Sequence, residues 1–71
     1  MNKKIQGKIN TIIMDIEEII SEHNITDKEG FLGTMSSIMC QLDTDIAIEV
    51  MDNLGEEGEY QAHAIKVNYG Y

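Results

Sequence analysis

The sequence has no proline, no tryptophan and no arginine, and it contains a single cysteine, Cys40. One cysteine excludes the intramolecular disulfides that many domains of this size use to support a small core. Tryptophan and arginine are among the side chains that most often anchor tight interfaces, and arginine binds phosphate groups through paired hydrogen bonds. The lack of proline is compatible with a mainly helical chain. A chain of 71 residues therefore needs another support, and its composition favours a partner subunit.

Negative charge dominates the composition, because thirteen acidic residues accompany only five lysines and the net charge is −8. The distribution is uneven: Lys3, Lys4 and Lys8 precede every acidic residue, whereas residues 15–59 hold all thirteen acids and only Lys28. Such a surface repels nucleic acids and anionic membranes and attracts basic partners. We expect no direct binding of nucleic acid, no membrane contact, and a basic or nucleic-acid-binding protein as one class of partner.

The longest uncharged segment runs from Gly30 to Leu42, and its 13 residues are fewer than the ~20 that span a bilayer. The basic start resembles that of a secretory signal, but Asp15 and Glu17 interrupt the apolar segment that such a signal requires. We therefore expect a soluble cytoplasmic protein. Frequent isoleucine, asparagine and lysine without arginine is typical of genes of low GC content, which include many phage genes. A phage protein would act in the host cytoplasm.

Isoleucines recur at alternating steps of four and three residues near the N-terminus, which is typical of the apolar face of an amphipathic helix. The residues of this face are Ile5, Ile9, Ile12, Ile13, Ile16, Ile19 and Ile20. The pattern predicts a helix over about residues 2–23. This helix offers more apolar surface than a segment of its length can cover alone, so it must pack against another surface.

A capping box formed by Thr26 and Glu29 predicts a second helix over about residues 27–42. Its expected apolar face consists of Phe31, Met35, Ile38 and Leu42. Gly30 and Gly33 weaken a helix by about 1 kcal/mol each relative to alanine, so they indicate either fraying or close packing of the backbone.

A third helix is expected over about residues 44–54. The run Asp43-Thr44-Asp45 offers its N-terminal cap, and Gly55 is a natural left-handed stop at its end. The sequence therefore predicts a single all-α domain, a small bundle of about three helices with a long N-terminal amphipathic helix.

The tail over residues 56–71 is ambiguous between a short strand and a helix. Ile65, Val67 and Tyr69 alternate as they would in a strand, whereas Ala62, Ile65 and Tyr69 would also line one side of a helix. Both alternatives remain open at this point.

The charges of the first helix favour self-association. Its lysines lie near the N-terminus and its glutamates near the C-terminus, which is opposite to the preference of the helix dipole. Two copies packed antiparallel would set Lys3 beside Glu22 and Lys8 beside Glu17. We therefore expect a homo-oligomer, with an antiparallel dimer of this helix favoured. The alternative is that the helix packs only within its own chain and its charges form a solvated face.

No residue pattern specifies a reaction, a cofactor or a metal. His23, Cys40 and His63 lack the short spacings of closed zinc sites, and Cys40 lies in an apolar run where a buried thiol is expected. The run Asp43-Thr44-Asp45 opens like a calcium loop, but the required turn glycine is replaced by Ile48. We expect a protein that is not an enzyme and has no catalytic, cofactor-binding or metal-binding residues.

The candidate binding residues fall into two groups. Candidates for contact with a partner protein are the three tyrosines near the C-terminus and two acids of the third helix: Tyr60, Tyr69, Tyr71, Glu49 and Asp52. Candidates for an anionic ligand are the N-terminal lysines Lys3, Lys4 and Lys8.

The function favoured by these features is that of a small acidic protein-interaction module, a self-associating regulator or inhibitor of another protein. One alternative is a nucleic-acid mimic, whose carboxylates would occupy the groove of a nucleic-acid-binding protein. A second alternative is an oligomer that sequesters a small anionic ligand such as a nucleotide.

Overall fold

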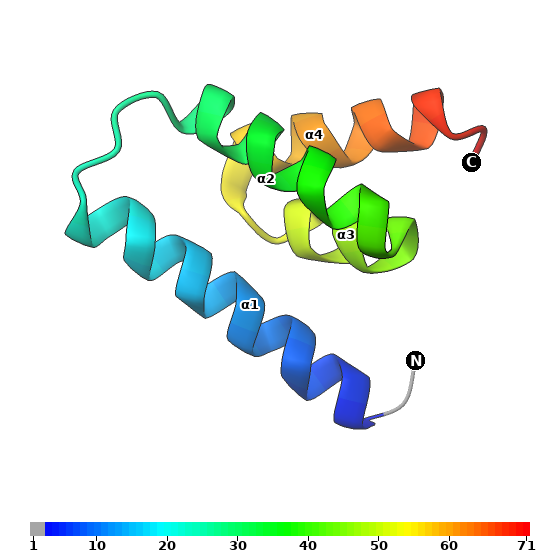
Figure 1. Ribbon diagram of the computed structural model, residues 1–71, viewed down its shortest axis with the longest axis horizontal. Helices are drawn as coiled ribbons and strands as arrows, with labels where there is room; N and C mark the ends of the chain where they lie inside the picture. The colour runs from blue at the N-terminus through cyan, green and yellow to red at the C-terminus, as the bar shows by residue number, and fades with distance from the viewer. Residues whose placement is uncertain (1–2) are drawn as a thin grey trace.

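A computed structural model describes residues 3–71, and within this range every regular element is a helix. The helices are α1 (Lys3–Glu22), α2 (Lys28–Leu42), α3 (Thr44–Asp52) and α4 (Gly55–Asn68) (Figure 1). The expected all-α fold is confirmed, with four helices in place of about three. The expected start of the first helix at Asn2 lies outside the described residues.

The C-terminal segment forms helix α4, so the strand alternative for the tail is wrong. Gly55 has the expected left-handed φ of +77° and is the first residue of α4. The third helix, expected to run to about residue 54, ends two residues earlier at Asp52, with Asn53 as its cap. Gly58, Ala62 and Ile65 are buried at helical spacing. The tail therefore covers the core with one side of a helix, and the alternation of apolar residues has no structural role.

Helix α3 lies at the centre of the domain, and each of the other three helices packs against it. Ala47, Val50 and Met51 on α3 are 0% exposed. The predicted cap lies in the run Asp43-Thr44-Asp45 and is Asp43, whose carboxylate accepts a hydrogen bond of 3.1 Å from the backbone N–H of Ile46. The shortest helix of the fold is thus the one that contacts all the others.

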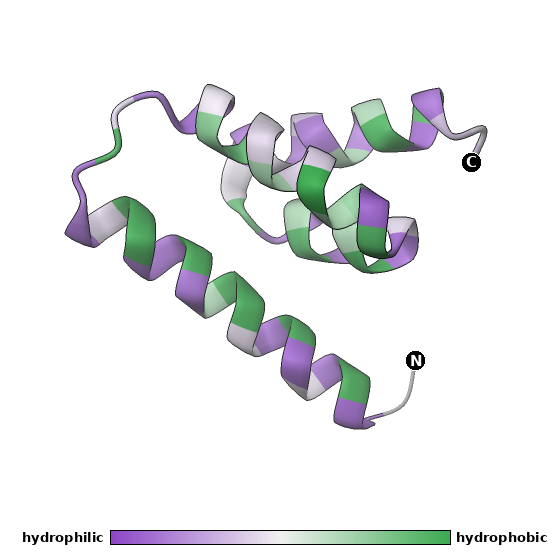
Figure 2. Cartoon of the chain, viewed as in Figure 1, coloured by the Kyte–Doolittle hydropathy of each residue, from purple (hydrophilic) through white to green (hydrophobic). Residues whose placement is uncertain are grey.

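Helix α1 packs on α3 and has no comparable contact with α2 or α4. Ile9 and Ile16 are the residues of α1 that are buried in the core. Figure 2 shows the hydrophobic residues of α1 along the side that faces the other helices. The isoleucine face is thus covered along its centre by the chain itself.

The predicted apolar face of α2 is only partly correct. Phe31 and Met35 pack against the core, but Ile38 is 51% exposed and Leu42 is 83% exposed. The buried residues of this helix are Leu32, Ser36 and Met39. The helix is therefore turned so that a neighbouring side faces the core.

Two small residues of α2, Gly33 and Ser36, lie next to Gln61 of α4. A side chain on Gly33 would be in van der Waals contact with Gln61 of α4, with its Cβ 3.5 Å from the amide nitrogen. The hydroxyl of the buried Ser36 donates to the carbonyl oxygen of Gly33 at 2.9 Å and lies 3.3 Å from Oε1 of Gln61. A Cβ at Gly33 would therefore fit at ordinary contact distance, and the contact between α2 and α4 at this point is the buried Ser36 hydroxyl, which is hydrogen bonded as a buried polar group must be.

The predicted capping box at the start of α2 is wrong by one residue. The cap is Asp27, whose carboxylate accepts a hydrogen bond of 3.0 Å from the backbone N–H of Gly30. An ionised carboxylate at a helix N-terminus also interacts favourably with the helix dipole, which the Thr26 hydroxyl cannot do. Asp27 therefore takes the role that the sequence pattern assigned to Thr26.

The close approach of α3 and α4 depends on Gly58. A Cβ at this position would overlap the carbonyl oxygen of Met51 and would lie 2.7 Å from Cβ of Leu54. By contrast, a Cβ on Gly7 of α1 would meet no atom within 4 Å. The two glycines make a matched pair for a test of packing.

We predict that Gly58→Ala lowers the free energy of unfolding by about 1–3 kcal/mol, because the added methyl group forces α3 and α4 apart. Gly7→Ala should instead raise it by about 0.5–1 kcal/mol, since alanine loses less backbone entropy in a helix. Urea denaturation of both variants measures the difference. Stabilisation of similar size by both substitutions would show that the α3–α4 corner is not closely packed.

Candidate interaction surfaces

Large apolar side chains remain exposed on three parts of the molecule. Within residues 3–71 they are Ile5, Met14, Ile19, Ile38, Leu42, Tyr60, Val67, Tyr69 and Tyr71. Single exposed apolar residues are common, whereas groups of them mark binding surfaces. The exposed residues of α1, of α2 and of the C-terminal segment form separate groups.

The isoleucines of α1 form rows at steps of seven residues. The central row is buried on α3, and the row of Ile13 and Ile20 is half-buried. The third row, which we call the outer row, consists of Ile5, Ile12 and Ile19. Ile5 is 38% exposed and Ile19 is 39% exposed, with Ile12 half-buried between them. The self-association expected from this helix stays a prediction, and the outer row is the part of the face left for it.

The two sides of α1 carry different charges. Lys4 and Lys8 line a shallow hollow of about 480 Å³ with Ile12, on the side of the outer row. Glu17 lines a separate pocket together with Ile20, on the opposite side. Lys8 and Glu17, which the sequence suggested as an intermolecular pair, therefore lie on different sides of the helix.

On α2, Ile38 and Leu42 lie one turn apart and are both exposed; we call them the α2 patch. They continue the half-buried side chains of Phe31 and Met35, so the apolar surface extends from the core to the end of the helix. Sequence reasoning placed these residues in the core. Gly33 and Ser36, which form a small-residue face on another side of α2, were the signal that could have shown the true orientation.

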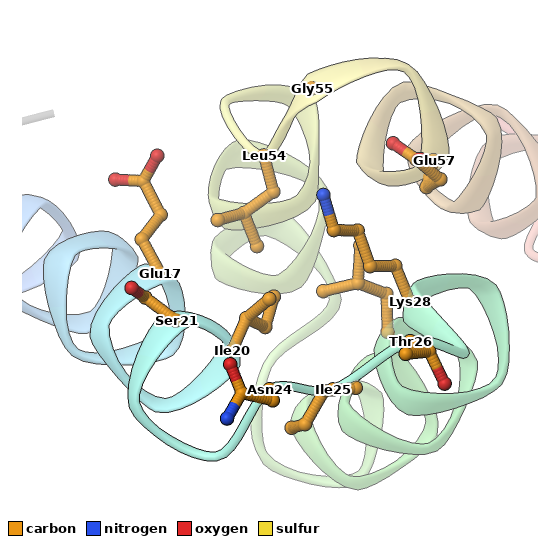
Figure 3. Close-up of a pocket in the computed structure, with 11 residues that line it drawn as sticks. Glu17, Ile20, Ser21, Asn24, Ile25, Thr26, Lys28, Leu54, Gly55 and Glu57 are labelled. Carbon is orange, nitrogen blue, oxygen red and sulfur yellow. The ribbon is translucent and has the colours of Figure 1, made fainter.

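A pocket of about 690 Å³ lies where the α1–α2 connection meets the α3–α4 turn (Figure 3). Its apolar lining includes Ile20, Leu32 and Leu54. Figure 3 shows the ammonium group of Lys28 between Leu54 and Glu57, while the carboxylate of Glu17 is directed away from the other lining residues. None of the tyrosines, acids or lysines suggested as binding residues lines this pocket, but Ile20 of the isoleucine face does.

The three tyrosines do not form one cluster. Tyr60 is exposed on α4, more than two turns before the last residue of that helix, Asn68. Tyr71 folds back so that its hydroxyl donates to the carboxylate of Asp45 and lies 2.8 Å from the hydroxyl of Thr44. Tyr71 therefore ties the C-terminal end of the chain to the start of α3, a contact across 26 residues that sequence reasoning missed.

The hydrogen bond to Asp45 raises the pKa of Tyr71 above its ordinary value of 10.0, because the phenol must lose its donated proton to ionise. Thr44 opposes this shift. A group with a raised pKa in the folded state stabilises the fold fully below its ordinary pKa, and this contribution disappears as the pH rises through the raised pKa.

We predict that Tyr71→Phe lowers the melting temperature slightly between pH 7 and about pH 9, and that the difference from the wild type shrinks above about pH 10. Thermal unfolding between pH 7 and pH 11 measures it. Tyr60→Phe serves as the control, because the exposed Tyr60 side chain has no hydrogen bond within the described residues. A Tyr71→Phe difference that is absent at pH 7, or unchanged at pH 11, would contradict the prediction.

Cys40 lines a hollow of about 310 Å³ between α2 and α4. The thiol is half-buried, which is less than the full burial expected from its apolar neighbours. Burial raises its pKa, and a hydrogen bond with the Tyr69 side chain partly opposes this by stabilising the thiolate. Tyr69 thus has a contact within the chain, apart from any role with a partner.

We predict that Tyr69→Phe raises the pKa of Cys40 further and therefore slows alkylation of the thiol near pH 8, since the thiolate is the reacting species. The rate of reaction with iodoacetamide as a function of pH measures the shift. Tyr60→Phe again provides the control. If the pH profiles of Tyr69→Phe and the wild type coincide, the phenol does not stabilise the thiolate.

The remaining candidate residues are dispersed. On α3, Asp52 is exposed and Glu49 is half-buried. Lys3 is not among the residues around the hollow that Lys4 and Lys8 share, and no tyrosine lines that hollow. The structure therefore brings together two of the three lysines proposed for an anionic ligand.

Among residues 3–71, no group of three or more histidine, cysteine, aspartate or glutamate side chains is placed to hold a metal ion. Nor is any helix in that range both long and apolar enough to cross a membrane. Comparison with protein-family models, with curated proteins and with solved structures gave no match to this chain, so its function is argued from its own residues.

Proposed function

We propose that the chain is a small acidic, non-enzymatic protein-interaction module, a self-associating regulator or inhibitor of another protein. The observation that carries this proposal is the exposure of Ile38 and Leu42 beside a well-formed core. Apolar surface left in water costs about 25 cal/mol per Å², and burying it against a partner recovers that free energy. A surface of this kind is typical of a site for protein binding.

The residues around the α2 patch favour a protein as its partner. The neighbouring exposed side chains of α2 are Thr34, Ser37 and Gln41, which are polar and uncharged. Charged residues are depleted in the central part of protein–protein interfaces, whereas a nucleic-acid site would need basic residues. The acids elsewhere on the surface would speed the approach of a partner with basic residues around its contact site.

We predict that the double substitution Ile38→Ser, Leu42→Ser abolishes retention of the partner while the fold persists. Because both side chains are largely outside the core, the free energy of unfolding should change by less than about 1 kcal/mol. The measurement is quantitative mass spectrometry of proteins that co-purify with the tagged chain from the cells that express it.

The matched control is Ser37→Ala, Gln41→Ala, which changes two exposed polar residues of the same helix. A protein retained by the wild type and by this control, and lost with the apolar double variant, supports the proposal. The same set of retained proteins for all three chains, or none for any of them, counts against it.

A further inference from the structure

The outer row of α1 lies beside a second row of residues at the same spacing, which we call the charged row. It consists of Lys8, Asp15 and Glu22, all exposed. Lys8 precedes Ile12 by four residues and Asp15 precedes Ile19 by four, so the two rows are neighbours along one side of the helix. The hollow shared by Lys8 and Ile12 confirms this neighbourhood.

The charged row changes sign along the helix, and its side chains form no ion pairs within the described residues. Lys8 is positive, whereas Asp15 and Glu22 are negative. Lys4, which also lines the hollow, extends the positive half. None of these side chains forms an ion pair with another residue of the part of the chain that the structure describes. Their charges are therefore available to a partner.

We propose that a second copy of this chain docks on the outer row through its own α1, antiparallel, with Ile12 of both copies at the twofold axis. The inference rests on the proposed function and names the occupant of one of its surfaces. In this register Ile19 meets Ile5 of the second copy, and Lys8 lies beside Asp15 of the second copy. Lys4 lies near Glu22 of the second copy. The same contacts recur on the other side of the axis, as an isologous interface requires.

The charges select this arrangement over others. A parallel pair would place Lys8 on Lys8 and Asp15 on Asp15, and like charges in contact are destabilising. A purely basic partner would be repelled by Lys4 and Lys8, and a nucleic acid would be repelled by Asp15 and Glu22. A second copy in antiparallel orientation is complementary to both halves at once. With one row of isoleucines at its centre, the contact is at the small end of specific interfaces, so association is weak and depends on salt.

The test is sedimentation equilibrium of the full chain over a range of concentrations near 0.1 M salt. We expect a concentration-dependent dimer for the wild type. Lys8→Glu alone and Asp15→Lys alone should each weaken it about tenfold, because each change converts two attractive pairs into repulsive ones. The double variant Lys8→Glu, Asp15→Lys should restore dimerisation to near the wild-type level, since the opposite charges again face each other.

Lys3→Glu and Glu17→Lys are the matched controls, because Glu17 lies on the other side of α1 and Lys3 is on the row of Glu17. Neither should change the dimer constant. Circular dichroism checks that every variant keeps its helices. A wild type that stays monomeric, a single variant that does not weaken the dimer, or a double variant that does not recover would each overturn the proposal. Binding of a different protein is tested separately, through the α2 patch. If the wild type is monomeric but still retains that protein, only the proposed self-docking is overturned, and the proposed interaction function stands.

Discussion

The structure depends on the burial of α3. A helix of nine residues is not stable alone in water, so its stability comes from packing against the other three helices. Ala47, Val50 and Met51 have no exposed surface, and α1, α2 and α4 are each held in place by contact with this short helix. Gly58 allows α4 to approach the end of α3, and the Asp43 cap fixes its beginning. The other three helices are therefore joined to one another mainly through α3, whose acidic side stays exposed.

The same constraint explains why apolar surface is left over. At 1.5 Å per residue, α3 is about 14 Å long and the 20-residue α1 is about 30 Å long. The shorter helix reaches only the middle of α1, so Ile5 and Ile19 toward its two ends keep exposed surface, while Ile12 between them is half-buried. On α2, the buried side holds Leu32, Ser36 and Met39, with Ser36 hydrogen bonded to Gln61, and this leaves Ile38 and Leu42 outside. Both apolar surfaces follow from the way the core is built, and both are available for association.

Sequence reasoning succeeded where the signal was local. The isoleucine spacing predicted α1, and the run Asp43-Thr44-Asp45 was expected to cap the third helix; the structure bears out both. Gly55 takes a left-handed φ as expected, although α3 ends two residues earlier than predicted, at Asp52. It failed where a choice between packed arrangements decided the outcome. Either side of α2 could have been buried as judged by periodicity, and only the close approach of α4 selects the side with Ser36. The contact of Tyr71 with Asp45 joins residues far apart in the sequence, so no local pattern could reveal it. The α2 patch was missed for the same reason.

Two chains of charge −8 repel each other, and self-association must overcome this repulsion. Salt screens charges that are separated by more than a Debye length, about 10 Å at 0.1 M, whereas charges in contact are screened much less. The antiparallel register places its opposite charges in contact and leaves most of the other acids far from the axis. The N-terminal lysines are the main source of positive charge in the chain, and this register uses them where they interact directly with carboxylates. An acidic protein can therefore dimerise through the helix that holds three of its five lysines in one half and carboxylates in the other.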